Sequence, residues 1–171
     1  MNKINLLVKP IQSGKTAESI KHIKAEYEND PSMFWIYICH NVLIANNQTS
    51  QRIGQEFGEN DTIISFTSQI KKKQKYKNGC TLEHKTKVKN VIETINSNSN
   101  VRGICMLAHP TRFKNYENGS DITRLLDNFE SINSISKVVI YIDEFDKYTK
   151  VISNNILQIS SYSKVSKIEL I

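Results

Sequence analysis

Apolar residues are concentrated in five short runs that polar positions hardly interrupt. The runs cover residues 4–8, 33–39, 62–66, 103–108 and 137–143, and they are rich in Ile, Val, Tyr and Phe. Apolar runs without alternation are typical of strands buried on both faces, as in a parallel sheet covered by helices. The last five residues, 167–171, form a sixth candidate strand.

Segments with helical periodicity lie between these runs. After Gly14, one helical face is formed by Ala17, Ile20, Ile23 and Tyr27, which recur at the spacing of an amphipathic helix. Further helices are predicted within 41–57, 85–95, 121–132 and 148–159. In the first of these we expect Leu43, Ile44 and Ile53 to form the apolar side.

The alternation of strands with helices predicts an α/β fold with a mostly parallel sheet of about five or six strands, flanked by helices. Two polar stretches, 71–79 and 96–100, are predicted loops. Neither stretch separates two hydrophobic cores, so residues 1–171 are predicted to form one domain.

Composition narrows the classes of protein that this sequence can represent. Hydrophobic residues make up 39% and charged residues 23% of the 171 positions, which is typical of a soluble globular domain. No apolar run approaches the roughly 20 residues of a membrane span, and no signal-peptide core is present. We therefore expect a protein that is not secreted and that acts in the cytoplasm, the nucleus or a virus factory.

The cysteines argue against a zinc site. Cys39, Cys80 and Cys105 include no CxxC pair, which structural zinc sites usually contain. Cys39 and Cys105 each lie in an apolar run, so both are predicted to be buried.

The sequence KPIQSGKT at 9–16 is a candidate phosphate-binding loop. It follows a predicted strand, precedes a predicted helix and ends in Gly14, Lys15 and Thr16, which is the context that such a loop needs. Backbone N–H groups from Ser13 onward would face the β-phosphate. Lys15 would reach the β- and γ-phosphates, and the Thr16 hydroxyl would hold Mg²⁺. The loop lacks the usual first Gly, because Lys9 takes that position.

The sequence VVIYIDEFD contains the acidic partner that a phosphate-binding loop requires. Asp143 ends a predicted strand and Glu144 follows it. Asp143 would bind Mg²⁺ directly or through water, and Glu144 would polarise the water that attacks the γ-phosphate. An adjacent Asp-Glu pair therefore indicates an ATPase that hydrolyses its nucleotide.

Together, KPIQSGKT and VVIYIDEFD resemble the ATP-binding lobe of superfamily 2 (DEAD-like) helicases. The resemblance implies a RecA-like P-loop NTPase domain with ATP and Mg²⁺ as cofactors. It also implies a nucleotide-binding loop that comprises Pro10, Ile11, Gln12, Ser13, Gly14, Lys15 and Thr16, with Lys15 and Glu144 as catalytic residues. ATP-dependent translocation along DNA or RNA, with a second RecA-like lobe as partner, is the implied activity. Because the sequence stops where the family's coupling motif begins, we expect this chain to be a first lobe that does not unwind on its own.

Predicted nucleic-acid contacts come from two kinds of signal. Exits of predicted strands correspond in order to backbone-contacting positions of the family, at Asn41, Gln48, Thr67, Thr111 and Arg112. Residues 71–89 contain eight lysines and one acid, Glu83, and Lys72 and Lys75 are predicted contacts there. Such a cluster suits a phosphate backbone. It is equally well explained as a solvated face of a lysine-rich protein.

Two other functions remain open at this stage. Thymidine-type kinases have a similar Ser-Gly-Lys-Thr loop and an Asp-Glu strand end. Their CxxC pairs are absent here, however, and the separation of 128 positions between Lys15 and Asp143 is longer than a small kinase needs. A nonhydrolysing P-loop binding module is the second alternative, although Lys15, Thr16, Asp143 and Glu144 are all present.

Overall fold

The chain folds around one eight-stranded sheet. A computed structural model describes residues 3–6 and 14–171. The strand order is β1-β8-β7-β2-β6-β3-β5-β4, and all neighbours are parallel except the β4–β5 pair. The strands are β1 Ile4–Leu6, β2 Met33–Cys39, β3 Thr62–Phe66, β4 Gln74–Lys75, β5 Thr81–Lys85, β6 Val101–Leu107, β7 Lys137–Ile142 and β8 Val165–Leu170.

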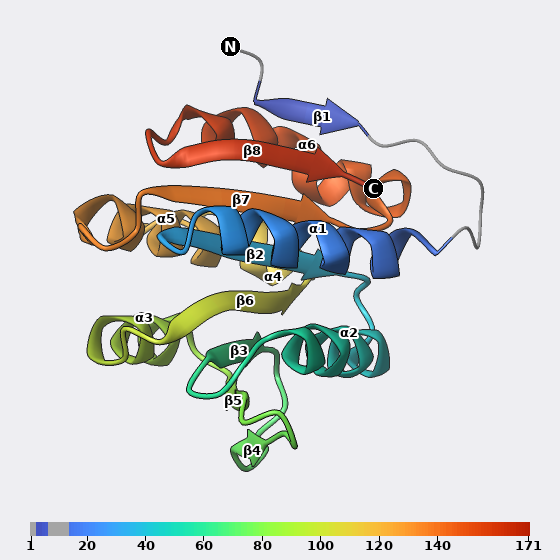
Figure 1. The fold of residues 1–171 in the computed structure, drawn as a ribbon. Helices are drawn as coiled ribbons and strands as arrows, with labels where there is room; N and C mark the ends of the chain where they lie inside the picture. The colour runs from blue at the N-terminus through green and yellow to red at the C-terminus, as the bar shows by residue number, and fades with distance from the viewer. Residues whose placement is uncertain (1–2, 7–13) are drawn as a thin grey trace.

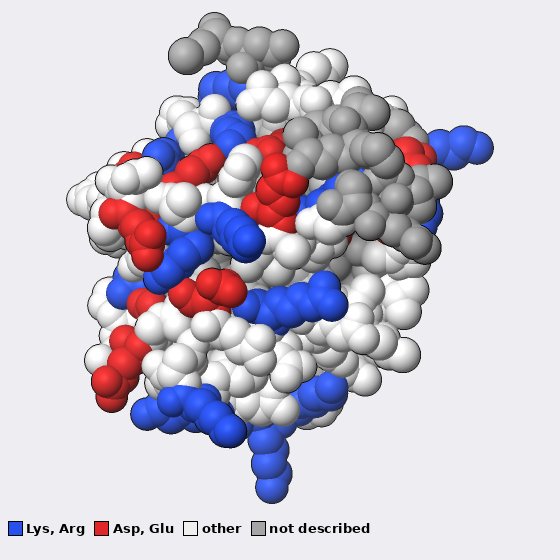
Figure 2. All heavy atoms as spheres, turned by 45° about the vertical axis from the view of Figure 1, so that its right-hand side comes forward, with Lys and Arg blue, Asp and Glu red and all other residues white. Residues whose placement is uncertain are grey.

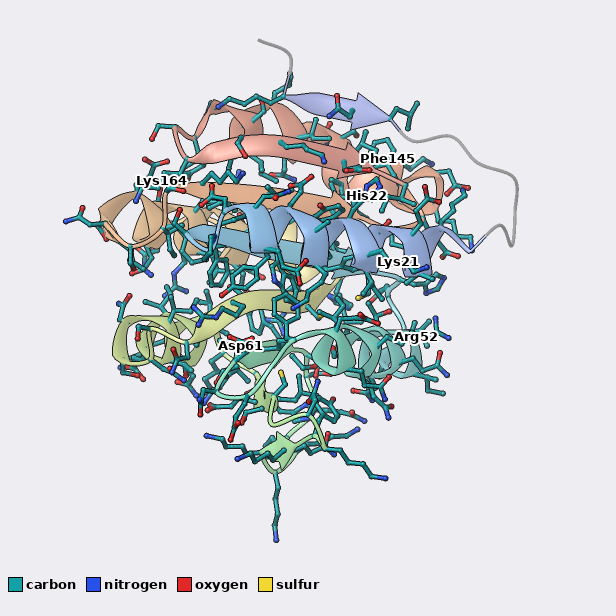
Figure 3. All side chains as sticks on the ribbon, in the orientation of Figure 1. Lys21, His22, Arg52, Asp61, Phe145 and Lys164 are labelled. Carbon is teal, nitrogen blue, oxygen red and sulfur yellow. The ribbon has the colours of Figure 1, made fainter. Side chains whose placement is uncertain are left out.

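Helices cover both faces of the sheet (Figure 1). Helices α1 (Lys15–Asn29) and α2 (Leu43–Glu56) lie on one face. The other face is covered by α3 Val88–Ser97, α4 Pro110–Phe113, α5 Asp121–Ser131 and α6 Phe145–Ser161. The outer side of α1 is solvent-exposed and includes Lys21 and His22 (Figure 3). This three-layer arrangement is the expected way to bury a parallel sheet.

The central strand β2 shows why the apolar runs do not alternate. Every residue of β2 is buried, but successive side chains contribute to different cores. Trp35 and Tyr37 belong to the core under α1 and α2, whereas Phe34 and Ile36 belong to the core on the opposite face. Successive side chains of a strand point to opposite faces, so a central strand needs apolar residues at every position.

The predicted α/β class is confirmed, and the sheet contains more strands than predicted. Strands β4 and β5 were missed because their sequences, QK and TLEHK, are polar. These two strands form the edge of the sheet beyond β3, where fewer side chains are buried. Part of the predicted loop 71–79 is therefore strand β4. At the opposite edge, β1 pairs only with β8 and is largely exposed; residues 7 and 8 of the predicted first strand lie outside the described residues.

The predicted apolar side of α2 was partly wrong. Ile53 is buried, but Ile44 is 67% exposed, and the buried positions include the polar residues Asn46 and Ser50. Asn46 is satisfied within the core, because its side-chain oxygen accepts hydrogen bonds from Ser65 at 2.8 Å and Ser50 at 3.3 Å. A buried polar group is tolerated when it is hydrogen-bonded in this way. The predicted burial of Cys39 and Cys105 is confirmed.

Gly103 of β6 provides a test of the central packing. It lies directly beside Trp35 of β2, and a Cβ atom on residue 103 would come within 2.1 Å of the Trp35 ring. We predict that Gly103→Ala lowers the free energy of unfolding by about 1–3 kcal/mol, because the fully buried indole has to move. Chemical denaturation measures this loss. Gly58→Ala is the control, since its added methyl group would be 3.7 Å from Asp61, an ordinary van der Waals contact; an equal loss in both variants would contradict the packing argument.

Candidate functional site

The candidate site lies at the carboxyl edge of the parallel sheet, beside the first turn of α1. Asp143 directly follows β7 and His40 directly follows β2, and these two strands are paired in parallel. Parallel strands all end at the same edge, so residues that follow them are brought together. The start of α1 reaches the same edge, because Thr16 contacts Asp143.

The entry to α1 depends on a glycine. Gly14 is the N-cap of the helix and has a φ of 76°, a left-handed conformation that glycine adopts without steric cost. Gly14 makes no side-chain cap to the helix, and backbone amides in the first turn of a helix can bind an anion. Gly14 is exposed, whereas Lys15 and Thr16 are half-buried.

One carboxylate oxygen of Asp143 is the meeting point of three elements. The Thr16 hydroxyl, from α1, donates a hydrogen bond to Asp143 Oδ2 at 3.1 Å. The Tyr37 hydroxyl, from β2, donates to the same oxygen, also at 3.1 Å. Thr16 and Asp143 are 127 positions apart in the sequence. The fold therefore brings the end of the predicted phosphate-binding loop into contact with the predicted acidic residue.

Tyr37 is a buried donor to this carboxylate. Burial, followed by the charge of Asp143, raises the pKa of the Tyr37 phenol well above its ordinary value. The phenol consequently stays protonated and continues to donate a hydrogen bond over the physiological pH range.

Glu144 lies in a different environment from its neighbour Asp143. Its Oε2 is 3.2 Å from His40 Nε2, and its Oε1 is 2.9 Å from Lys147 Nζ. Glu144 is also the N-cap of α6, with a φ of 53°. A left-handed backbone is uncommon outside glycine, and it turns the chain sharply between the strand and the helix, so that the two adjacent carboxylates have separate partners.

Backbone hydrogen bonds hold the acidic turn between two strands. The Asp143 N–H donates to the Ile38 carbonyl at 2.9 Å. On the other side, the Ile171 N–H donates to the Ile142 carbonyl at 2.9 Å, and the Phe145 N–H donates to the Ile171 carbonyl at 3.2 Å. The turn is therefore supported by Ile38 within β2 and by Ile171, which follows β8, as well as by its own strand.

An ion-pair network fastens the rest of α1 to β8. Lys167 Nζ is 2.6 Å from Glu26 Oε1 of α1 and 2.9 Å from Glu169 Oε2 of β8. Burial alone would lower the pKa of Lys167, but hydrogen bonds to the two carboxylates raise it. The lysine thus remains charged and helps to fix the helix that carries Thr16.

The donor set at Asp143 fits a hard divalent cation. Mg²⁺ prefers oxygen ligands and is commonly held by few protein groups together with water and substrate phosphates. The Thr16 hydroxyl and the Asp143 carboxylate supply two such oxygens at one point. No group of three or more His, Cys, Asp or Glu side chains suited to a metal ion occurs within 3–6 and 14–171, so a cation here would need phosphate or water to complete its coordination.

The structure brings together the described members of the predicted nucleotide site. Gly14, Lys15 and Thr16 form the start of α1, and Thr16 meets Asp143. The predicted loop residues Pro10, Ile11, Gln12 and Ser13 lie outside the described residues.

The predicted nucleic-acid contacts differ in accessibility. Gln48, Lys72, Lys75 and Thr111 are exposed, and Asn41 is half-buried. Thr67 is fully buried. Arg112 is 2.7 Å from Asp121 and lies over the Phe66 ring at 3.8 Å. A contact from Thr67 or Arg112 to a ligand would require these internal interactions to change, whereas the exposed residues can be reached directly.

Sequence reasoning missed the residues that support the two acids. Tyr37 was assigned only to a buried strand, and neither His40 nor Lys147 was given a role beside the acids. Tyr37 and His40 lie near the carboxyl end of β2, which was an available signal. The pairing of β2 with β7 had to be known, however, before either residue could be placed beside Asp143 or Glu144.

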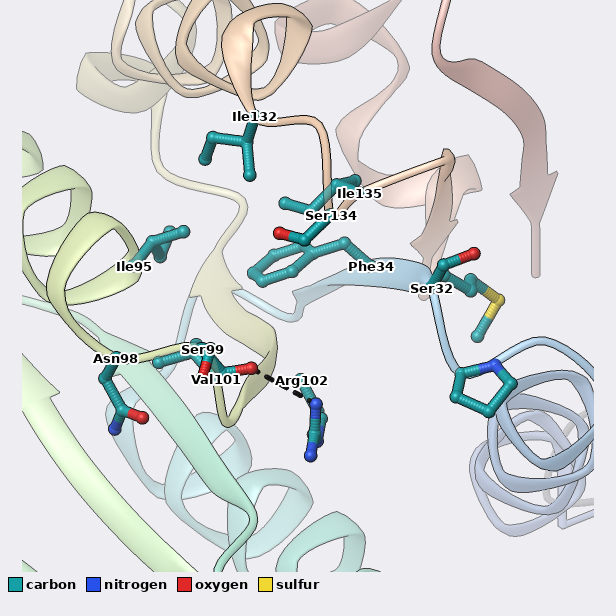
Figure 4. A pocket seen from close by; sticks show the side chains of 12 residues that line it. Ser32, Phe34, Ile95, Asn98, Ser99, Val101, Arg102, Ile132, Ser134 and Ile135 are labelled. Atoms are coloured by element: carbon teal, nitrogen blue, oxygen red, sulfur yellow. Dashed lines mark hydrogen bonds between the residues drawn. The ribbon is translucent and has the colours of Figure 1, made fainter.

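A separate cavity lies at the opposite, amino edge of the sheet (Figure 4). It has a volume of about 340 Å³ and lies among Ser32, Phe34, Asn98, Ser134 and other residues. Its one guanidinium, that of Arg102, is already held by Asp61 at 2.6 Å. The cavity shares no residue with the candidate site.

Comparison with known proteins supports the fold. No protein-family model matches the sequence, and no curated protein matches it. A solved structure of a nuclease-deletion mutant of the Type ISP restriction-modification enzyme LlaGI, in complex with a DNA substrate mimic, has a TM-score of 0.65 and 17% sequence identity. The match covers 99% of this chain and 15% of that protein. It shows a shared α/β fold, consistent with a RecA-like domain.

Within the described part of the chain, no helix is both long and apolar enough to cross a membrane.

The raised pKa of Tyr37 leads to a prediction for alkaline pH. An unfolded tyrosine ionises near pH ~10, whereas folded Tyr37 keeps its proton, so the free energy of unfolding falls as the pH rises above that value. We predict that Tyr37→Phe makes this fall less steep by about 1.4 kcal/mol per pH unit, the contribution of one proton. Urea denaturation at several alkaline pH values measures the slope. Tyr116→Phe, which changes a 55% exposed tyrosine, is the control, and the same change of slope in both variants would refute the assignment.

Proposed function

We propose that this domain is the ATP-binding and hydrolysing lobe of a nucleic-acid-dependent ATPase of the helicase or translocase type. The observation that carries the proposal is the contact between the Thr16 hydroxyl and Asp143 Oδ2 at 3.1 Å. A nucleotide site of this class needs a hydroxyl after the loop lysine and a strand-end carboxylate to share one Mg²⁺.

The proposed roles follow from the geometry. The first-turn amides of α1 and Lys15 would bind the β- and γ-phosphates of ATP. Thr16 and Asp143 would hold Mg²⁺, which neutralises phosphate charge when it is bound. Glu144 would orient and polarise the attacking water. His40 and Lys147 would act as positioning residues, since both contact the Glu144 carboxylate.

Nucleic acid and a second RecA-like lobe are the proposed partners. The fold likeness to a restriction-modification enzyme that was solved with a DNA substrate mimic supports this choice. The exposed residues Gln48 and Thr111, and half-buried Asn41, follow β2 and β6 along the chain. They are proposed to contact the nucleic-acid backbone.

Lys15 is the most direct test of nucleotide binding. We predict that Lys15→Ala weakens binding of a fluorescent ATP analogue with Mg²⁺ by on the order of 10–100-fold, because charge-assisted bonds to phosphate are lost. Fluorescence titration measures the affinity. Lys21→Ala is a matched control, since Lys21 lies on the exposed side of the same helix (Figure 3). Unchanged affinity in Lys15→Ala would remove the nucleotide-site assignment.

Glu144 tests hydrolysis separately from binding. Glu144→Gln is predicted to keep the affinity for ATP and to lower the turnover rate by about 10²–10⁴-fold, because the amide cannot accept the proton from water. Phosphate release, measured with and without DNA or RNA, reports the rate. Full turnover in the variant would refute the role of Glu144, and transfer of the γ-phosphate to a nucleoside would favour a kinase instead.

A further inference from the structure

A second pocket lies between α2 and the β4–β5 hairpin, away from the Thr16–Asp143 contact. It has a volume of about 390 Å³, and its polar lining includes Asn47, Gln51, Lys71, Lys75, Tyr76 and His84. Lys and Arg side chains are gathered at the lower end of the molecule in Figure 2, where Figure 1 places β4 and β5. Two lysines of the basic cluster seen in the sequence, Lys71 and Lys75, therefore line a defined cavity.

The walls of this pocket are fastened together. The Asn78 side-chain amide, in the hairpin turn, donates to the carbonyls of Gly54 at 2.9 Å and Phe57 at 2.5 Å, at the end of α2. The Tyr76 ring lies against Gly54 so closely that a Cβ there would come within 2.4 Å of it. On the loop after β3, Gln69 accepts a hydrogen bond from Asn47 at 3.3 Å. The hairpin is thus packed on α2, and the pocket is preformed.

The pocket is lined by basic but not by acidic side chains, because successive side chains of β5 point to opposite faces. Glu83, the acid of this lysine-rich segment, lies between Leu82 and His84 on β5, and its side chain therefore points to the opposite face. There it pairs with Lys73 at 3.1 Å and Lys85 at 3.0 Å. Glu83 does not line the pocket, but Lys71 and Lys75 do. Within the described chain, neither of these two lysines has an acidic partner.

His84 adds two hydrogen-bonding atoms that the fold does not use. Both of its ring nitrogens are buried, and neither has a hydrogen-bond partner among the described residues. Burial, followed by the charge of Lys71, lowers the pKa of the imidazole. A buried polar atom without a partner is unusual and costs stability. A bound ligand that accepts a hydrogen bond from the ring would remove part of this cost.

We propose that the pocket between α2 and the β4–β5 hairpin binds a backbone phosphate of a single strand of nucleic acid, through Lys71, Lys75 and His84. This inference rests on the proposed function, since it assigns part of the track for the nucleic-acid partner. Lys, Asn and Gln side chains are common phosphate and sugar contacts, and all three types line the cavity.

The shape and position favour a strand over a duplex or a free ion. A cavity of about 390 Å³ accommodates roughly one nucleotide of a single strand, whereas a duplex cannot enter it. The amides of Asn47 and Gln51 supply further donors and acceptors beside the lysines. Asn47 also precedes Gln48, another proposed backbone contact, on α2, and this helix begins at the carboxyl edge of the sheet after β2.

The test compares two double variants that remove the same charge from the same segment. We predict that Lys71→Ala/Lys75→Ala weakens binding of a short fluorescein-labelled oligothymidylate by about ten-fold or more, without ATP or Mg²⁺. The plot of log affinity against log salt concentration should become shallower by about 1.4, as expected for two lost phosphate contacts on a single strand. Lys77→Ala/Lys87→Ala is the matched control, because both lysines are exposed and neither lines the pocket. Fluorescence anisotropy measures both quantities.

The outcomes separate this pocket from the nucleotide site. A much larger loss in the pocket variant than in the control, together with a shift of the His84 ring resonances on adding the strand, supports the proposal. Equal losses in both variants, or no binding by the unmodified protein, would overturn it while leaving ATP binding as a separate measurement. Lys15→Ala should bind the strand normally; if it does not, the strand occupies the loop at α1 and the pocket assignment fails. Inorganic phosphate that binds as tightly as the strand would also contradict it.

Discussion

The parallel pairing of β7 with β2 and β8 is the constraint on which the candidate site depends. Because all three strands run the same way, the residues that follow them meet at one edge. The backbone of the acidic turn is then held from both sides, through the Ile38 carbonyl and through Ile171. The Asp143 carboxylate is thereby placed where the first turn of α1 can reach it.

The two adjacent acids, Asp143 and Glu144, have different kinds of neighbouring side chain. Asp143 is bonded by neutral hydroxyl groups of Thr16 and Tyr37, which leaves its negative charge available to a cation. Glu144 is instead next to the basic side chains of His40 and Lys147. The left-handed backbone at 144 separates the two environments, and such backbone conformations persist only when surrounding contacts impose them. The fold thus gives two adjacent carboxylates different partners, which the proposed division of roles between Asp143 and Glu144 requires.

The β5–β4 edge of the sheet is less buried than its centre, so its sequence is less constrained to be apolar. Strands β5 and β4 lie beyond β3 and are mostly not buried, so their side chains can be charged. Attachment of the hairpin to α2 through Asn78 and Tyr76 makes this edge ordered without an apolar core of its own. A protein with a net charge of +6 thus concentrates part of its excess charge around a preformed cavity.

The sequence by itself determined the α/β class, the buried strands and the residue types of the candidate phosphate-binding loop and of the acidic turn. These features are local: uninterrupted apolar runs indicate buried strands, and short motifs identify chemistry. Polar β4 and β5 were not predictable in this way, because an edge strand needs no apolar pattern. Only the tertiary structure decided that Tyr37 supports Asp143, that His40 meets Glu144, and that Glu83 points away from the basic pocket. These contacts are set by strand order and register. Strand order and register in turn depend on packing between segments that are far apart in the chain.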